Sequence, residues 1–168
     1  MNGELFYMMN NIYFAKLNEK ARIPNKRLED AGYDVYTSDT HTPIIFEPHE
    51  TRLLPTGICS SFSTNLVAVV KERGSTGTKG LGVRAGIIDS GYRGEWFIAL
   101  TNHNDKPLII APTDYDLVED VILYPNTKAI AQVLFLPVPV LNVVEVSLEQ
   151  IKGSQSERGT GALGSSGK

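Results

Sequence analysis

The sequence has little of what several classes of protein require. It contains one cysteine, Cys59, so no disulfide can form within the chain, and Cys59 is expected to be a small buried apolar residue. No run approaches the roughly 18 apolar residues of a membrane span, and no basic segment followed by a long apolar run marks a signal peptide. The formal net charge of −3 over 168 residues offers no strongly basic face to nucleic acid. We therefore expect a cytoplasmic protein that binds neither membranes nor nucleic acid.

Several catalytic signatures are missing as well. No Walker A loop is present, and no GxGxxG segment follows a strand-like run, so a dinucleotide-binding fold is not expected. No segment resembles a nucleophile elbow. His41, His49 and His103 stand in separate turns without the spacing of metal ligands, which argues against a structural zinc.

The chain does contain many short apolar runs rich in β-forming residues, separated by turn formers. About ten such runs at this spacing are typical of an all-β sandwich, jelly roll or barrel. The run 142–148, "NVVEVSL", is the last of them. Only 75–81 and 147–153 are expected to form a turn or so of helix, and nine prolines argue against longer ones.

The domain organisation predicted from these runs is one β domain, 1–152, followed by a flexible glycine-rich arm, 153–168, which has too few apolar groups to order alone. Within the domain, 105–128 is expected to be an excursion between strands with a small hairpin. Its charged edge consists of Asp114, Asp116, Glu119 and Asp120.

The segment 72–80, "ERGSTGTKG", follows an apolar strand and is suited to phosphate. Glycines let backbone N–H groups turn toward one point, while hydroxyls and cations add hydrogen-bond donors. The alternative is an ordinary glycine-rich hairpin. The polar groups of this segment are Arg73, Ser75, Thr76, Thr78 and Lys79.

The segment 87–96, "IIDSGYRGEW", carries a second candidate site. Asp-Ser-Gly is a good turn sequence, so a plain hairpin is one interpretation. However, Asp89 follows two isoleucines expected to be buried, an environment that orients a carboxylate. Tyr92 adds a ring face and a hydroxyl. A base and a flat aromatic ring beside phosphate loops would suit hydrolysis of a nucleotide.

Taken in order, five segments resemble the motifs of the trimeric dUTPase family, and 86–96 is the most specific of them. The resemblance implies a jelly-roll-like β fold, a homotrimer with active sites at subunit interfaces, and Mg²⁺-dependent hydrolysis of dUTP to dUMP and pyrophosphate. The segments are "AGYDVYTSD" (31–39), "ERGSTGTKG" (72–80), "GIIDSGYRGEW" (86–96), "AIAQVLFLPV" (129–138) and "RGTGALGSSG" (158–167).

The resemblance also implies roles around the nucleoside. Asp89 would activate the water that attacks the α-phosphorus. Tyr92 would pack under the deoxyribose and leave no room for a 2′-hydroxyl. The hairpin backbone at 83–89, including Gly86 and Ile88, would read the uracil edge.

Around the phosphates, the resemblance implies that Asp34 lies near the metal through water and that Gln132 lies near the α-phosphate. Arg158 of the arm would clasp the γ-phosphate, with Ser165 and Ser166 as further donors. Leu163 would cover the base.

Three positions depart from the family pattern. Gly74 follows Arg73 where the family has serine, so Ser75 either reaches phosphate through a shifted loop or loses that contact. Ala129 stands at the arginine of the fourth motif, with Lys128 one place away. Leu163 replaces the aromatic residue of the fifth.

Other functions remain open from the sequence. The related dCTP deaminases are one, although Glu95 reads better as a strand-edge charge. A non-catalytic or dual-role regulator that binds a protein partner through 105–128 is another. A capsid-type jelly roll would explain the strands but not the phosphate-like loops.

Overall fold

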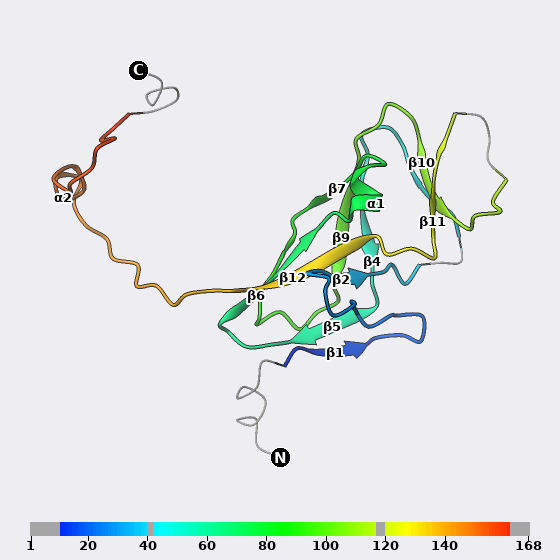
Figure 1. Cartoon of the computed structure of the whole chain (residues 1–168), viewed down its shortest axis with the longest axis horizontal. Helices are drawn as coiled ribbons and strands as arrows, with labels where there is room; N and C mark the ends of the chain where they lie inside the picture. Colours follow the sequence, from blue (N-terminus) through cyan, green and yellow to red (C-terminus); the bar gives the residue numbers. More distant parts are fainter. Residues whose placement is uncertain (1–10, 40–41, 117–119, 162–168) are drawn as a thin grey trace, which may run out of the picture. The chain divides into compact units, whose positions relative to one another are not determined.

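The computed structural model describes residues 11–39, 42–116 and 120–161, and it divides the chain into two units, 1–138 and 139–168. The regular secondary structure of the first unit is almost wholly strand, which confirms the all-β prediction (Figure 1). The one helix among the described residues of this unit, α1 (Gly74–Gly77), is a single turn. The strands are β1 (Tyr13–Lys16), β2 (Tyr33–Val35), β3 (Ile44–Phe46), β4 (Thr51–Pro55), β5 (Ile58–Ser61), β6 (Leu66–Lys71), β7 (Leu81–Arg84), β8 (Ile87–Ile88), β9 (Phe97–Asn102), β10 (Leu108–Ala111), β11 (Ile122–Pro125) and β12 (Ala131–Pro137).

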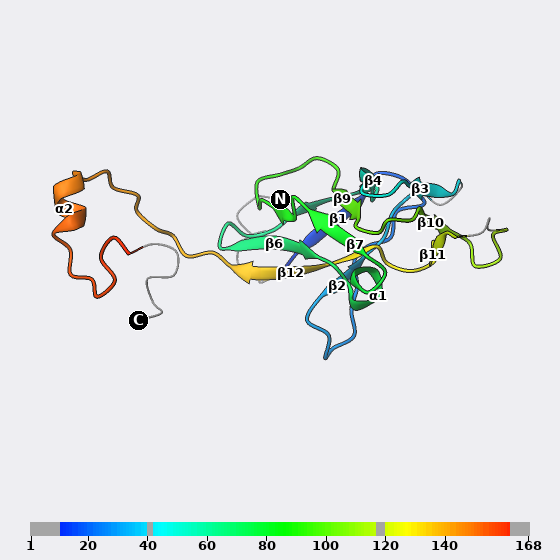
Figure 2. The ribbon, with the colours of Figure 1, turned by 90° about the horizontal axis from the view of Figure 1, so that it is seen from above.

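The strands form four small sheets, and the sheet with the order β2-β12-β6-β8 positions most of the predicted site residues. Its centre is the long antiparallel pair of β12 and β6, which run side by side in Figures 1 and 2. The other sheets have the orders β1-β5, β11-β10-β3 and β4-β9-β7.

The core takes alternate residues from strands such as β5, as the period of two predicts, and consecutive residues from β9 and β10. Its largest buried side chains include Trp96, Tyr124 and Phe46. Phe135 of β12 contacts Phe62 edge-to-face at 5.2 Å between ring centroids, the arrangement that aromatic rings prefer. The predicted turn of helix near residue 75 is also confirmed, as α1.

The segment 105–128 differs from its prediction. β10 and β11 lie within it, but they pair in parallel, so the predicted small hairpin is wrong. All four residues of β10 are buried, and this strand is the central one of its sheet, between β11 and β3. Because β10 and β11 run in the same direction, the chain between them must cross back to the end of the sheet where β10 begins. Asp114 and Asp116 of this connection are exposed, and Asp120 pairs with Lys106.

The second unit contains the helix α2 (Leu148–Lys152). The Ser147 hydroxyl accepts a hydrogen bond from the Gln150 amide, and the Gln150 side chain accepts one from the Ser147 amide, a capping box that starts the helix. The predicted strand at 142–148 is wrong: the residues before α2 belong to no strand. An apolar run of this kind forms a strand only when a neighbour satisfies its backbone groups. None of the described helices is long and apolar enough to cross a membrane.

Candidate active site

The first candidate site is a polar cavity of about 640 Å³ beside the ends of β2, β6 and β12. The strand register brings its residues together. Gln132 of β12 lies opposite Asp34 on one side and opposite Lys71 of β6 on the other. The loop that carries Arg73 therefore begins next to both. Ser75 and Lys128 also line the cavity, so a cation is present near the position where the family pattern has arginine.

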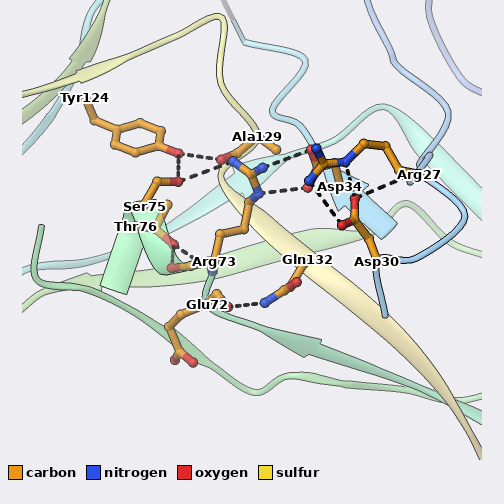
Figure 3. A network of polar contacts seen from close by, with 10 residues as sticks. All are labelled: Arg27, Asp30, Asp34, Glu72, Arg73, Ser75, Thr76, Tyr124, Ala129 and Gln132. Carbon is orange, nitrogen blue, oxygen red and sulfur yellow. Dashed lines mark hydrogen bonds and ion pairs between the residues drawn. The ribbon is translucent and has the colours of Figure 1, made fainter. Parts of the chain in front are cut away.

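An ion pair between Arg73 and Asp34 crosses this cavity (Figure 3). Arg73 Nε lies 2.7 Å from Asp34 Oδ1, and Nη2 donates to Oδ2 at 3.1 Å. The two side chains are 29% and 26% exposed, so water screens this pair less than a surface pair. A fork of two parallel bonds fixes the plane of the guanidinium as well as its position.

Two hydroxyls extend the network from Arg73 into the core. Arg73 Nη1 donates to Ser75 Oγ at 3.3 Å, and Ser75 Oγ lies 3.2 Å from the hydroxyl of Tyr124. Tyr124 in turn donates to the carbonyl of Ala129 at 2.6 Å. Sequence reasoning missed Tyr124, because nothing in a tyrosine of a strand indicates which loop its hydroxyl reaches.

Thr76 has a different place from the other hydroxyls of its segment. It is fully buried, accepts a hydrogen bond from the Arg73 amide at 2.9 Å and donates to the Arg73 carbonyl at 3.0 Å. These bonds close the turn of α1 and hold the backbone of Arg73. Contact between Thr76 and phosphate stays a prediction.

Gln132 is positioned by both of its neighbours. Its Nε2 donates to the carbonyl of Glu72 at 2.7 Å. Its Oε1 lies where a side chain at Gly32 would be, since a Cβ there would come within 2.3 Å. A side chain at residue 32 would therefore have to displace the Gln132 amide.

Glu72 supports the same loop from behind. Burial raises the pKa of its carboxyl, but hydrogen bonds from the amides of Val83 and Glu72 itself, together with the ammonium of Lys71, outweigh burial and leave the pKa below its ordinary value. The Val83 amide donates to Glu72 Oε1 at 2.7 Å, which ties the loop to β7.

Arg27 and Asp30, at the rim of the cavity, were also missed from the sequence. Arg27 Nε lies 3.0 Å from Asp30 Oδ2. The hydrogen bond between them raises the pKa of Arg27 and lowers the pKa of Asp30. Their spacing of three residues was the available signal, but such pairs are common on protein surfaces.

The second candidate site is a smaller cavity of about 250 Å³ formed by residues 85–97. The plain hairpin that the sequence suggested here is wrong, because β8 pairs with β6 whereas β9 pairs with β4 and β7 in another sheet. Asp89 and Tyr92 both line it, together with Ile88 and Glu95. The Tyr92 hydroxyl donates to the carbonyl of Glu95 at 3.0 Å, which sets the direction of the ring.

The surroundings of Asp89 differ from the prediction. Ile87 is 61% exposed and Asp89 is exposed, so the expected pair of buried isoleucines is wrong. β8 has two residues at the edge of its sheet, and successive residues of a strand point to opposite faces. Gly86, in contrast, packs so closely on β6 that a Cβ would come within 2.4 Å of the Val70 carbonyl oxygen.

The remaining predicted residues belong to the second unit. Arg158 is exposed, and its Nε donates to the carbonyl of Gly161 at 2.9 Å. Leu163, Ser165 and Ser166 lie outside the described residues. The two cavities of the first unit share no lining residue.

Comparison with known proteins places this arrangement. The dUTPase family model matches residues 18–167. The chain belongs to the dUTPase family. A deoxyuridine 5'-triphosphate nucleotidohydrolase of Clostridioides difficile is 34% identical over 164 residues, which cover 95% of this chain and 99% of that protein. The protein of the same name from Gloeobacter violaceus is 35% identical over 141 residues, 82% of this chain and 83% of that one.

Solved structures of dUTPases share the fold. The dUTPase of Staphylococcus bacteriophage 80alpha with dUpNHpp has a TM-score of 0.74 and 25% identity, and the match covers 95% of this chain and all of that one. A mutant of the dUTPase from phage phi11 of S. aureus, described with a structural Mg(II) ion, has a TM-score of 0.64 and 24% identity over 82% of this chain and 97% of that one. The family and fold predicted from the five motifs are thus confirmed.

Proposed function

We propose that this dUTPase family member hydrolyses dUTP to dUMP and pyrophosphate. The observation that carries the proposal is the second cavity, where Asp89 and Tyr92 lie together in the segment that most resembles the family motif. A carboxylate beside a flat ring provides a base for water and a platform for a sugar. The dUTP nucleotidohydrolases among its relatives support the same reaction.

In this mechanism residues 85–97 bind the nucleoside. The exposed carboxylate of Asp89 accepts a proton from the water that attacks the α-phosphorus, a role worth roughly 10²–10⁴ in rate. The ring of Tyr92, directed by its bond to Glu95, packs under the deoxyribose and excludes a 2′-hydroxyl. The backbone around Gly86 and Ile88 reads the uracil edge.

The first cavity binds the triphosphate. Arg73, fixed by Asp34, presents its guanidinium to the phosphate oxygens, and Gln132 lies near the α-phosphate. Arg158, Ser165 and Ser166 of the arm would bind the terminal phosphate, and Leu163 would cover the base. Closure of such an arm excludes bulk water from the reaction.

The residues of the first cavity fit Mg²⁺ held mainly by the substrate. No three metal-binding side chains gather among the described residues, and both oxygens of Asp34 face Arg73. Phosphate oxygens would be the direct ligands, with Asp34 acting through water. A cation bound there would supply charge neutralisation and orientation of the triphosphate.

A homotrimer is part of the proposal, because the groups that must meet line two different cavities of the chain. The carboxylate and ring lie in one cavity and the cationic phosphate site in another, without a shared residue. Pairing the first cavity of one subunit with the second cavity of its neighbour would complete each site. A cytoplasmic location also stays a prediction.

A protein partner is a second proposed function. The connection between β10 and β11 carries exposed acidic residues, Asp114 and Asp116. The dUTPase of phage 80alpha is described as one of the phage dUTPases that control transfer of virulence genes by a G protein-like mechanism. This likeness supports a regulatory contact through 105–128.

The test is pyrophosphate release from dUTP, dCTP, dTTP and UTP, with Mg²⁺ and with EDTA. We expect fast release from dUTP alone, and little with EDTA. Ammonia released from dCTP would instead indicate a deaminase. Folded protein that leaves dUTP intact would contradict the proposal and favour a regulator on the same fold.

A further inference from the structure

The hydrogen bonds of Tyr124 have a direction that proton counting determines. Tyr124 is 1% exposed, and its hydroxyl carries one proton. The Ala129 carbonyl, 2.6 Å away, can only accept, so that proton goes to Ala129. The contact of 3.2 Å between Tyr124 and Ser75 therefore has Ser75 as its donor.

The same count applies to Ser75. Its one proton is committed to Tyr124, and its oxygen accepts from Arg73 Nη1 at 3.3 Å. The chain of donors thus runs from Arg73 through Ser75 and Tyr124 to the Ala129 carbonyl, away from the cavity (Figure 3). In this arrangement Ser75 has no proton left to donate to a phosphate oxygen.

Arg73 gains a second support from this chain. A guanidinium has five N–H groups, of which Nε and one on Nη2 bond Asp34 and one on Nη1 bonds Ser75, leaving two among the described contacts. Asp34 holds one edge and Ser75 holds the other nitrogen, so the guanidinium cannot rotate out of its plane. The two remaining N–H groups are those that can bind phosphate oxygens.

We propose that Tyr124 is a positioning residue for phosphate binding, acting through Ser75 on Arg73. The inference rests on the proposed function, because it assumes that Arg73 binds the substrate's phosphates. In this proposal Ser75 accepts a hydrogen bond and so orients Arg73, instead of donating a hydrogen bond to a phosphate oxygen. It also makes β11, a strand outside the five family-like segments, part of the phosphate site.

A double-mutant cycle tests the proposal, with Tyr124→Phe, Ser75→Ala and the double variant in the full chain. Phenylalanine removes the hydroxyl and keeps the buried ring. We expect each single variant to raise KM for dUTP about 3- to 10-fold, as loss of one hydrogen bond does, with kcat changed less than about twofold. The double variant should be no worse than the more impaired single variant, because both break one chain.

Thr37→Val is the matched control. Thr37 is also buried, at 3% exposed, its hydroxyl also donates to a backbone carbonyl, that of Pro55 at 3.0 Å, and it lines neither cavity. We expect it to lower the melting temperature without changing KM. A rise in KM equal to that of Tyr124→Phe would make the Tyr124 effect one of general stability, and would overturn the proposal.

Three other results would also overturn it: an unchanged KM in Tyr124→Phe, additive effects in the double variant, or a much larger effect of Ser75→Ala than of Tyr124→Phe, which would mean that Ser75 binds phosphate itself. Measuring the Kd of inorganic tripolyphosphate for the same four proteins separates this inference from the proposed reaction. If the wild type leaves dUTP intact, the proposed function fails, and the cycle in Kd still decides the role of Tyr124.

Discussion

The two cavities differ in how much of their geometry one chain supplies. In the phosphate cavity, Arg73 is held by Asp34 and Ser75, and its backbone is held by Thr76. In the cavity of residues 85–97, Asp89 is exposed, and Tyr92 is 45% exposed and donates its hydroxyl to one carbonyl. The phosphate cavity is therefore organised before substrate binds, whereas the cavity of residues 85–97 presents its reactive groups to solvent.

This difference follows from what each group must do. A guanidinium can be ion-paired inside a cavity and still keep N–H groups for phosphate, so support from the chain costs it little function. A base must keep its carboxylate oxygens free for water, so cross-links within the subunit would disable Asp89. The cavity of residues 85–97 is therefore enclosed only when the substrate and the proposed neighbouring subunit cover it.

The largest effect is expected from Asp89→Asn, which tests whether Asp89 is the general base. We expect kcat to fall roughly 10²–10⁴-fold with KM for dUTP within about threefold, because the amide cannot take the proton. Pyrophosphate release measures both constants. Asp39→Asn, outside both cavities, is the control and should behave as the wild type. Equal losses in both variants would mean that Asp89 is not the base.

The next effect concerns the close packing of Gly86 on β6. In Gly86→Ala the new Cβ would lie 2.4 Å from the Val70 carbonyl oxygen, a backbone atom that cannot move aside. We expect a loss of roughly 1–3 kcal/mol in the free energy of unfolding, measured by urea denaturation. Gly91→Ala adds the same methyl where nothing lies within 4 Å, so it should be close to neutral. Equal stability of the two variants would show that residue 86 does not pack closely on β6.

A smaller effect is expected in the phosphate half. Arg73→Lys keeps the charge but loses the fork to Asp34 and the bond to Ser75. We expect KM for dUTP to rise about tenfold with a lesser change in kcat, since an ammonium cannot reproduce the planar contacts. Arg52→Lys, in an exposed pair with Glu50, should leave the kinetics unchanged. A tolerated lysine at residue 73 would mean that charge alone binds the phosphates.

The smallest effect tests the support behind the phosphate cavity. The pKa of Glu72 is lowered in the folded protein. The charged carboxylate therefore stabilises the fold at pH values above its ordinary pKa of 4.5, and this contribution is lost as pH falls through the lowered pKa. Between about pH 5 and pH 3, the melting temperature of Glu72→Gln should therefore fall less steeply than that of the wild type. Parallel curves would show that Glu72 does not contribute to acid sensitivity.

Sequence patterns predicted the all-β fold and the family, because strand periodicity and the five motifs are local properties of the chain. They did not predict the parallel pairing of β10 and β11, since pairing direction depends on where the returning strand finds an open edge. They grouped Arg73 with phosphate but missed Tyr124, whose contribution depends on contacts 49 residues away in the chain. The buried place of Thr76 was missed for the same reason: a hydroxyl-rich segment does not reveal which hydroxyl closes its own turn.

The position of β12 has a consequence for how the protein is made. This last strand of the first unit lies between β2 and β6, and its register places Gln132 between Asp34 and Lys71. A ribosome that has not yet released β12 therefore holds a chain with two unpaired strand edges and no phosphate cavity, and such edges favour aggregation. The strand that completes the site also joins β2 to β6, so a nascent chain gains its phosphate cavity and pairs these two open edges in one late step.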